Sequence, residues 1–455
     1  MTGFEPPTTG ATGLEPELVR AAAAPGALRA TILDLWQRLR IDWSLAGEGL
    51  SAMLRERRLG SRERRFVAEV LYGLMRNLRR VDEGLAGAGL SGGTRARDEL
   101  RLIAFLVLEG GLSPADASAV SSAVDWSAVA AVDQRLAAVA DPARRLAGRW
   151  SLPDWLAGRL VADLGDAAEP LVEALSQRGP AAIRVNPLVQ SPDELIAKLA
   201  ADGVSAAPGR LASTALVVAA PTDLHRLDSF RAGGFEPMDE GSQLIAELVA
   251  PPARGLVVDF CAGAGGKSLA MAAAMGNRGR VFAADVDGRK LGRLRKRAKR
   301  AGVTTIHSVA MDPEGDLPAA LARIAGRAQR VLVDAPCSGL GALRRHPETR
   351  WRLAEVDLDE LPRRQLRIAE RALPLVAPGG WLVYATCTVL RAENQEVVAA
   401  LLARHRDLSP VPVADILGPE RAAEVADPSG RFLLLQPHRH GSDGFFAVVL
   451  ERAGS

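Results

Sequence analysis

The spacing of apolar residues divides the chain into regions with different predicted secondary structure. Across residues 26–145 apolar side chains recur at the i, i+3 and i+4 positions of amphipathic helices, as they do between Phe66 and Leu74. We therefore predict an all-α domain over residues 26–145. Residues 1–25 are rich in Pro, Thr, Gly and Ala and carry no sustained apolar period, so we expect a disordered tail there.

Residues 146–235 combine helix and strand patterns. A short apolar run at 181–186 ends at Pro187, and a second run lies at 215–218, as expected for strands. Between them, Ser-Pro-Asp-Glu at 191–194 has the composition of a helix capping box. We predict that this region is a small α/β connecting domain.

From residue 236 to residue 455, strand patterns alternate with helix patterns. Apolar runs of strand length occur at 256–260, 280–284, 305–310, 330–333, 381–384 and 445–450. Helical patterns such as 291–301 and 361–375 separate them. This alternation is typical of α/β proteins and predicts a mostly parallel, doubly wound, Rossmann-like sheet.

The composition is that of an ordinary globular protein, because 48% of the 455 residues are hydrophobic and 24% are charged. The first residues lack the basic and apolar segments of a signal peptide, and the apolar run 102–108 is too short to cross a bilayer. We therefore expect a cytoplasmic protein without a membrane partner.

Positive charge is concentrated locally, although the net charge is only +3. Basic clusters occur at 55–58, 62–65, 76–80, 289–300 and 344–345. One such run is more often the solvated face of a helix, but several clusters together favour a polyanionic partner.

The chain contains three cysteines, Cys261, Cys337 and Cys387, and each follows a predicted strand. A cysteine is usually a small buried hydrophobe, but these three stand beside Asp, Pro, Ser or Thr at strand ends, where open α/β sheets bind ligands. No C-x-x-C pair is present, so no metal site is expected, and an odd number argues against a disulfide framework. The topology therefore predicts two thiols and a glycine-rich turn at one edge of the sheet.

The glycine-rich turn lies between the strand 256–260 and a helix that begins near Ser268. It consists of Cys261, Ala262, Gly263, Ala264, Gly265, Gly266 and Lys267. Small residues let a ligand approach the backbone amides of a helix N-terminus, and the turn alone would suit NAD, S-adenosylmethionine or no ligand. Its glycine spacing is not that of a P-loop, so ATP hydrolysis is not expected.

Two aspartates extend this candidate site to the next strand ends. Asp285 ends the following strand, where a carboxylate accepts hydrogen bonds from ribose hydroxyls. Asp312 follows the third strand and offers an acceptor for an adenine amino group. Each aspartate alone is equally well explained as a loop or helix cap. Matching positions on three successive strand ends favour a nucleoside-containing cofactor.

A series of motifs in this part of the chain resembles the RsmB/NOP family of RNA cytosine-5 methyltransferases. The matching segments are 234–235, 239–244, 265–268, 334–339, 344–347 with Trp351, 384–388, 393–394 and 443–446. Residues 65–76 resemble, more loosely, the NusB-like RNA-binding domain of the family's bacterial ribosomal RNA branch, and 183–186 resembles a strand of its connecting domain. The resemblance implies a NusB-like domain at 26–145 and a class I S-adenosylmethionine-dependent methyltransferase domain at 236–455.

The resemblance also implies roles for individual residues. Cys387 is the expected nucleophile, Cys337 the residue that assists release, and Asp334 a residue that borders the cofactor and hydrogen-bonds to N3 of the ring. Lys267 is expected to contact the base or a phosphate. The implied partner is small-subunit (16S) ribosomal RNA, and we expect a monomeric protein.

Two thiols suit this reaction on chemical grounds. C5 of cytosine becomes nucleophilic only after a thiolate adds to C6, and a second group is needed to help remove the C5 proton before the thiol leaves. The target base must be unpaired or flipped out of a helix to reach them.

The chain departs from the family pattern at a few positions. Gly263 and Ala264 replace Ala-Pro, Met238 replaces Gln before an aspartate, and Thr388 replaces Ser after Cys387. None of these changes removes a reactive group. The same reaction on transfer RNA and a non-catalytic RNA-binding assembly factor stay open as alternatives. A DNA cytosine methyltransferase would use the Pro-Cys thiol as its nucleophile, and a nicotinamide dehydrogenase would need a polar acid or base beside its ring.

Overall fold

The computed structural model describes residues 13–90, 94–219 and 223–454, which form two compact units. The helical unit takes the described residues up to Arg178 and the segment Leu343–Glu355. The sheet unit takes Gly179–Ala342 and the described residues from Val356 onward. Within the described ranges no helix is long and apolar enough to cross a membrane.

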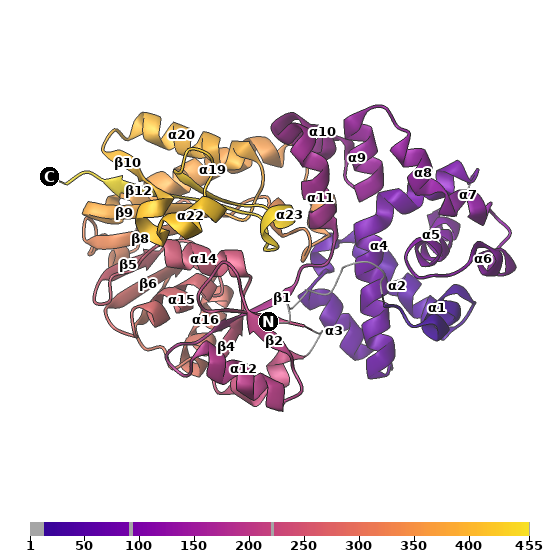
Figure 1. The fold of residues 1–455 in the computed structure, drawn as a ribbon, viewed down its shortest axis with the longest axis horizontal. Coiled ribbons are helices and arrows are strands. Elements are labelled where there is room, and N and C mark those ends of the chain that lie inside the picture. The colour runs from indigo at the N-terminus through magenta and orange to yellow at the C-terminus, as the bar shows by residue number, and fades with distance from the viewer. Residues whose placement is uncertain (1–12, 91–93, 220–222, 455) are drawn as a thin grey trace. The chain divides into compact units, whose positions relative to one another are not determined.

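The helical unit contains no strand among its described residues, so the predicted all-α character of this region is confirmed (Figure 1). Its α-helices are α1 (Pro16–Ala23), α2 (Ala27–Ile41), α3 (Glu48–Glu56), α4 (Ser61–Gly87), α5 (Thr94–Leu108), α6 (Pro114–Val120), α7 (Trp126–Ala130), α8 (Val132–Ala137), α9 (Pro142–Trp150), α10 (Asp154–Leu164), α11 (Ala168–Ser176) and α18 (Thr349–Arg352). Short 3-10 helices lie at Trp43–Leu45 and Gly165–Ala167.

The predicted disordered tail is wrong for residues 16–23, because they form α1 and bury Val19, Ala22 and Ala23. The buried positions of this helix are two alanines and one valine, and such small side chains gave too weak a periodic signal in a Pro- and Thr-rich context. Residues 1–12 lie outside the described residues.

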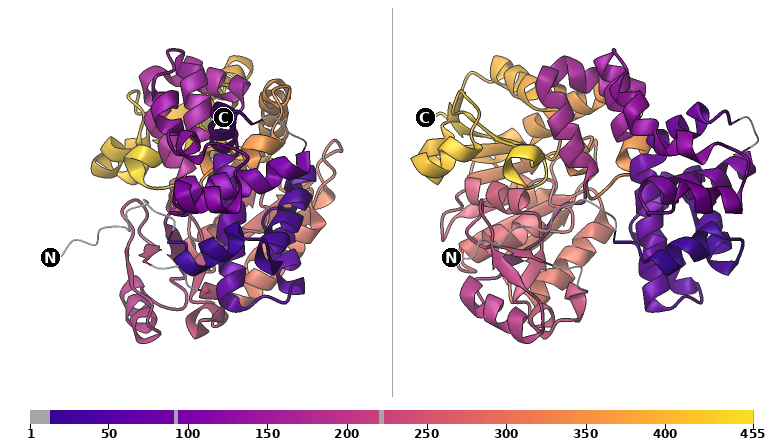
Figure 2. Two further views of the ribbon diagram at one scale, coloured as in Figure 1. Left: turned by 90° about the vertical axis from the view of Figure 1, so that its right-hand side faces the viewer. Right: turned by 45° about the vertical axis from the view of Figure 1, so that its right-hand side comes forward.

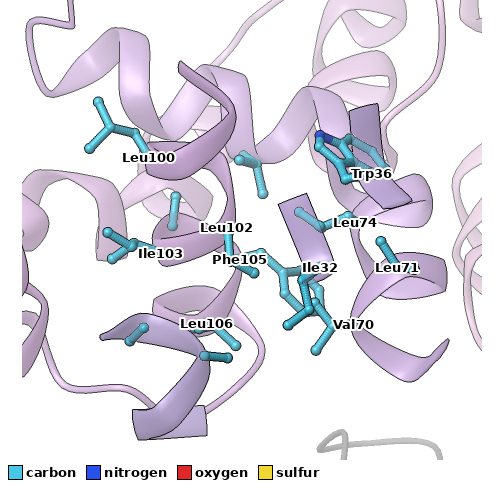
Figure 3. Packing of buried hydrophobic residues seen from close by; sticks show 14 of the residues in the cluster. Ile32, Trp36, Val70, Leu71, Leu74, Leu100, Leu102, Ile103, Phe105 and Leu106 are labelled. Atoms are coloured by element: carbon cyan, nitrogen blue, oxygen red, sulfur yellow. The ribbon is translucent and has the colours of Figure 1, made fainter. Parts of the chain in front are cut away.

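The core of the helical unit forms where α2, α4 and α5 meet (Figure 3). Ile32 and Trp36 from α2 pack with Leu74 from α4 and Phe105 from α5, and all four side chains are buried. Gly73 lets the Phe105 ring approach α4 closely, since a Cβ at this position would lie 2.3 Å from the ring. Burial of each large apolar side chain stabilises the unit by about 1.5–3 kcal/mol, so tertiary packing rather than helix propensity holds these helices.

The segment Leu343–Glu355 belongs to the helical unit although it lies between strands of the sheet unit in the sequence. Arg350 donates from Nη1 to the carbonyl oxygen of Trp150 at 2.8 Å. The indole Nε1 of Trp351 donates to the carbonyl oxygen of Met75 at 2.7 Å. Backbone carbonyl groups of the helical unit thus accept hydrogen bonds from two side chains of this segment.

The first sheet of the sheet unit is small and antiparallel, as expected for the connecting domain. Its strands are β1 (Ala181–Val185), β2 (Ala206–Pro208), β3 (Ala215–Val218) and β4 (Phe235–Pro237), in the order β2-β3-β1-β4. The helices α12 (Pro192–Ala201) and α13 (Asp228–Arg231) and a 3-10 helix (Leu224–Arg226) accompany them. The predicted capping box is present, since Ser191 accepts from the amide of Glu194. The strands β2 and β4 escaped prediction because each has only three residues.

The second sheet carries the candidate site. Its strands are β5 (Leu256–Asp259), β6 (Arg280–Asp285), β7 (Ile306–Ala310), β8 (Ala328–Asp334), β9 (Val376–Thr386), β10 (Leu408–Val411), β11 (Phe432–Leu435) and β12 (Phe445–Arg452). The order is β10-β12-β9-β8-β5-β6-β7, with β11 paired to β12. The strands β9, β8, β5, β6 and β7 are parallel, while β12 runs antiparallel to β9, β10 and β11.

Helices cover both faces of this sheet, which confirms the predicted doubly wound architecture (Figures 1 and 2). Val257 packs with residues of α14 and α15, whereas its neighbour Val258 packs with residues of α19 and α20. The helices are α14 (Glu240–Leu248), α15 (Gly266–Ala274), α16 (Gly288–Arg300), α17 (Ala319–Ala322), α19 (Asp357–Ala372), α20 (Gln395–Arg404), α21 (Val413–Leu417), α22 (Pro419–Val425) and α23 (Pro437–His440), with 3-10 helices at Leu340–Ala342, Leu373–Leu375 and Arg391–Glu393.

The strand order reverses beside β5, because β6 follows on one side and β8 on the other. Ligands of open α/β sheets bind beyond the carboxyl ends of the strands at such a point. The three cysteines follow β5, β8 and β9, which are neighbours in the sheet, so the predicted gathering of these residues at one edge is confirmed.

Candidate active site

Two of the three thiols lie together where β8 and β9 end. The Sγ atoms of Cys337 and Cys387 are 3.4 Å apart. Backbone hydrogen bonds tie the two loops, because the amide of Gly341 donates to the carbonyl oxygen of Cys387 at 2.9 Å. Gly341 has no substitute here, since a Cβ would lie 2.1 Å from the carbonyl oxygen of Gly444. Parallel strand pairing and a glycine contact therefore set the spacing of the thiols.

A partly buried ion pair lies beside the thiols. Lys267 Nζ lies 2.7 Å from Asp334 Oδ2 and 5.6 Å from the centre of the Phe445 ring. Burial lowers the pKa of Lys267, but the charges of Asp334 and Cys387 and the hydrogen bond to Asp334 outweigh it and raise the pKa overall. Lys267 is therefore a cation, and it supplies positive potential to Cys387, as thiolate formation requires.

The surroundings of Cys337 keep its thiol protonated. The hydrogen bond with Cys387, then burial, then the charges of Cys387 and Glu393 raise the pKa of Cys337 well above its usual value. Cys337 is thus a neutral thiol that can donate its proton to the sulfur of Cys387. We name Cys337, Cys387, Lys267 and Asp334 the thiol site.

The third cysteine, Cys261, lies in the glycine-rich turn. Burial and the charges of Asp259, Asp334 and Asp285 raise the pKa of Cys261 well above its usual value. A neutral thiol in this position is a poor nucleophile. Cys261 therefore contributes to the wall of a pocket rather than to covalent chemistry.

The glycine-rich turn is held from several sides. Gly265 has a φ of 82°, and a Cβ there would lie 2.5 Å from Leu294, so only glycine fits before α15. The amide of Gly263 donates to Asp285 Oδ2 at 2.7 Å. Arg297 donates to the carbonyl oxygen of Ala264 at 2.8 Å. Gly266 and Lys267 begin α15, so their amides point out of a helix N-terminus.

A pocket of about 280 Å³ opens beside this turn at the ends of β5, β6 and β7. We call it the cofactor pocket, and it is lined by Phe260, Cys261, Asp285, Val286, Lys290, Met311, Pro313, Glu314, Pro336, Arg364, Arg367, Ile368 and Arg371. Its apolar walls suit the faces of a purine, and the Asp285 carboxylate suits ribose hydroxyls. Of the two aspartates beyond the turn, Asp285 therefore lies in the pocket wall.

The predicted cofactor residue Asp312 lies just outside that wall, between Met311 and Pro313, which do line it. Its Oδ1 accepts from the amides of Glu314 and Gly315, at 3.0 and 3.1 Å. This is a turn cap, the alternative that the sequence left open.

Asp259 is a candidate that the sequence did not single out. Oδ2 accepts from Ser268 Oγ at 2.6 Å, whereas Oδ1 is buried without a hydrogen-bond partner. Burial raises the pKa of Asp259 to about 7, partly offset by the bond from Ser268. Its position at the end of β5 was the one sign in the sequence that it could belong to the site. The sequence of a strand does not show whether an oxygen will be left without a hydrogen-bond partner.

The basic clusters divide into internally paired and outward-facing groups. In the helical unit, Arg80 is bound by Asp133 and Glu109, and Arg57 by Asp34. In α16, Arg297 and Arg300 bind Glu236, whereas Arg289, Lys290, Arg293, Arg295, Lys296 and Lys299 are exposed. Within the described residues, no group of three or more His, Cys, Asp or Glu side chains is placed to hold a metal ion.

Family models match two parts of the chain. Residues 246–451 match the model of 16S rRNA methyltransferase RsmB/F, and residues 152–225 match the ferredoxin-like domain of RsmF/B-like methyltransferases. The second match begins inside the helical unit, which extends to Arg178. The predicted domain boundary near residue 146 therefore stays a prediction.

Curated relatives extend the similarity over most of the chain. The chain is 36% identical over 327 residues to a probable ribosomal RNA small subunit methyltransferase B of Bacillus subtilis, covering 70% of each protein. It is 30% identical over 457 residues to ribosomal RNA small subunit methyltransferase B of Vibrio cholerae, covering 95% of this chain and 97% of the relative.

Solved structures support the fold. The crystal structure of PH0851 superposes with a TM-score of 0.73 at 24% identity, over 97% of this chain and all of that chain. NSun6 from Pyrococcus horikoshii superposes with a TM-score of 0.58 at 20% identity, over 67% of this chain and 99% of that chain.

Proposed function

The chain belongs to the RsmB/F family of S-adenosylmethionine-dependent ribosomal RNA cytosine methyltransferases, and from this premise we propose that it methylates C5 of a cytosine in 16S ribosomal RNA through a covalent bond between Cys387 and C6. One observation carries the covalent part of the proposal. The two thiols are 3.4 Å apart, and the raised pKa of Cys337 keeps that thiol protonated. Two adjacent cysteines, one of which is held protonated, suit the two different tasks of the reaction.

The residues around the cofactor pocket fit S-adenosylmethionine. Asp285 offers an acceptor for ribose hydroxyls, and the amides at the start of α15 suit a carboxylate. The unpaired Oδ1 of Asp259 offers an acceptor for an ammonium group, which also explains why a buried oxygen lacks a partner in the protein. S-adenosylmethionine, when bound, supplies the methyl group as a sulfonium electrophile.

In the first step we propose that the Cys387 thiolate adds to C6. The S–C6 bond forms, and the electron pair of the C5–C6 double bond moves through C4 toward N3, which takes up a proton. The Asp334–Lys267 pair stabilises that proton, since Asp334 accepts hydrogen bonds and Lys267 balances its charge. The ring becomes an enamine whose C5 forms a bond to the methyl group as the bond from the methyl carbon to the sulfonium sulfur breaks, with S-adenosylhomocysteine as the leaving group. N3 then returns its proton to water.

Release requires a base for the C5 proton, and the geometry supports Cys337 in this role. The largest cause of the raised pKa of Cys337 is its hydrogen bond with Cys387. Once the Cys387 sulfur carries the base, this hydrogen bond no longer favours the protonated form of Cys337, which makes Cys337 a better base at the stage where one is needed. Cys337 then loses its proton to water and takes the C5 proton. The C5–C6 double bond reforms, and the electron pair of the C6–S bond returns to Cys387.

The choice of ribosomal RNA rests on the names of the relatives, and the charge distribution supports an RNA partner. The exposed cations of α16 form a continuous basic face next to the cofactor pocket, of which Lys290 is also a wall residue. Such a face attracts phosphates without reading sequence. The helical unit contributes RNA contacts in this proposal as the NusB-like region.

Bisulfite sequencing of ribosomal and transfer RNA tests the proposal in cells that carry the gene, lack it, or carry it with Cys387→Ala. We expect one cytosine of 16S ribosomal RNA to lose its methyl group in both deficient strains. Loss of a transfer RNA methyl group instead would move the substrate to transfer RNA. Unchanged methylation in all RNA, with a ribosome-assembly defect in the strain that lacks the gene, would favour the assembly factor.

A further inference from the structure

A buried carboxylate without a charged hydrogen-bond donor lies behind the two thiols. Glu393 closes the 3-10 helix Arg391–Glu393, and its side chain is fully buried. Oε1 accepts from Ser338 Oγ at 2.5 Å and from Thr388 Oγ1 at 3.0 Å. Oε2 accepts from the amide of Ser338 at 2.8 Å and from Gln365 Nε2 at 2.8 Å. All four donors are neutral groups.

Three of these four donor groups belong to the residues that follow the cysteines. Ser338 follows Cys337, and Thr388 follows Cys387. Gln365, on α19, also donates to the carbonyl oxygen of Pro336 at 3.1 Å, which fixes the other side of Cys337. One carboxylate therefore holds both thiol loops by short hydrogen bonds.

The backbone of Glu393 is itself fixed from the sheet. The buried Tyr384 hydroxyl, on β9, donates to the carbonyl oxygen of Glu393 at 2.6 Å. Asn394 accepts from Thr386 Oγ1 at 2.5 Å and donates to the carbonyl oxygen of Thr388 at 3.1 Å. The backbone that carries this carboxylate is thus hydrogen-bonded to β9, the strand that precedes Cys387.

Stability alone does not explain a charge in this place. A buried carboxylate loses its hydration, and apolar side chains of similar volume commonly replace such groups without loss of stability. Full satisfaction of its lone pairs makes the network rigid and specific in geometry. The atoms that this rigidity fixes are those on either side of the thiols.

We propose that Glu393 is a positioning residue that sets the distance between Cys337 and Cys387 and thereby couples addition to release. This inference rests on the proposed function, in which the two thiols act in sequence on one base. Thr388 keeps the hydroxyl that the network uses, so the replacement of the family's serine at this position leaves the network intact.

The test uses the full chain with Glu393→Ala and Glu393→Gln, and the exposed Glu396→Ala as the matched control. The glutamine oxygen can still accept from Ser338 and Gln365, and its NH2 can donate to hydroxyls that rotate to accept. We expect Glu393→Ala to lose about 100-fold in the rate of single-turnover methylation, because thiols displaced by about 1 Å react poorly. The KM for RNA and the affinity for S-adenosylmethionine should stay within about threefold, and Glu393→Gln should retain most of the rate.

Thr388→Val and Thr388→Ser decide the question if Glu393→Ala does not fold. Valine removes only the hydroxyl, so its rate should fall about tenfold, while serine should match the parent. Equal rates for valine and serine, or a folded Glu393→Ala enzyme within about threefold of the parent, would overturn the inference. Activity in Cys387→Ala would instead remove the proposed function itself, so the two failures are distinguishable.

Discussion

The cofactor pocket and the thiol site share one edge of the sheet, but they are built in opposite ways. The pocket is an open cavity whose wall carries Asp285 together with several cations, and Asp259, next to the wall residue Phe260 in sequence, keeps an unpaired oxygen. In the thiol site the two sulfur atoms are in contact and Lys267 binds Asp334. Behind the thiols, both carboxylate oxygens of Glu393 accept hydrogen bonds. The region that must admit a ligand leaves one buried acceptor unused, whereas the carboxylate behind the reacting atoms has hydrogen bonds on both of its oxygens.

The largest effect should come from the two thiols themselves. Cys387→Ala should reduce methylation by at least about 10⁴-fold and abolish any covalent RNA adduct, because C5 never becomes nucleophilic. Cys337→Ala should still add and methylate, then retain the RNA because release lacks its base. A denaturing gel after incubation with S-adenosylmethionine measures the adduct directly.

The double variant provides the control for this gel, since an adduct through Cys387 must disappear when both thiols are removed. An adduct that accumulates in Cys387→Ala instead would exchange the two roles and point to the mechanism expected of DNA cytosine methyltransferases.

The next effect concerns the pocket, where Asp285→Ala should weaken S-adenosylmethionine binding about 10- to 100-fold. The loss corresponds to about 1.5–3 kcal/mol for hydrogen bonds to a carboxylate and includes the bond from Gly263. Asp312→Ala is the matched control and should reduce the affinity less than about threefold, because Asp312 lies outside the pocket wall. Calorimetry with S-adenosylmethionine and NAD measures both, and equal losses in the two variants would contradict the distinction between these aspartates.

A smaller effect follows from the titration of Asp259, whose folded pKa of about 7 lies above its unfolded value. The folded state therefore holds this proton more tightly, so the associated stability is present below about pH 4 and is lost as pH rises through 7. The free energy of unfolding should fall by about 2–3 kcal/mol between pH 5 and pH 7.5, and the fall should be absent in Asp259→Asn. Denaturant titrations at several pH values measure this difference.

The same titration gives a cofactor readout. If Asp259 receives an ammonium group, only its ionised form binds well, so the affinity for S-adenosylmethionine should rise about tenfold from pH 6 to pH 8. The rise should vanish in Asp259→Asn. A pH-independent affinity in the parent protein would assign the unpaired oxygen to another purpose.

The smallest effect belongs to the surface outside both sites. Lys296→Gln with Lys299→Gln should weaken RNA binding a few-fold and make its salt dependence shallower by about two units of slope, one for each phosphate contact. Arg406→Gln, an exposed cation at the β10 end of the sheet, is the control. Filter binding at several salt concentrations measures the slope, and an unchanged slope would make α16 a solvated face.

Periodicity and strand-end positions predicted the parts of this molecule that depend on local sequence. Apolar runs located β5 to β9, and the parallel pairing of these strands followed from their alternation with helices. The strands β10 and β11 were missed because they pair only through β12, an arrangement fixed by tertiary contacts rather than by their own pattern. Alanine-rich α1 was missed because its small apolar residues resemble those of a tail.

The sequence likewise predicted only part of the candidate site. Cys337, Cys387 and the glycine turn lie at strand ends that topology alone brings together. Sequence could not separate Asp285 from Asp312, because backbone amides bind both carboxylates and the difference lies in which one the folded chain places in the pocket wall. Neither could it recognise the roles of Glu393 and Asp259, since burial and hydrogen-bond count are properties of the folded chain.

The segment Leu343–Glu355 has a consequence for dissection of this protein by truncation. A fragment that starts near residue 236 would still contain Arg350 and Trp351. It would lack the carbonyl groups of Trp150 and Met75 that accept their hydrogen bonds. The guanidinium of Arg350 and the indole of Trp351 would then lack these acceptors, and both residues lie close to Cys337 in the sequence. Excision of the helical unit is therefore not a clean test of RNA binding, and the two units can be exchanged between homologues only if this segment travels with the helices.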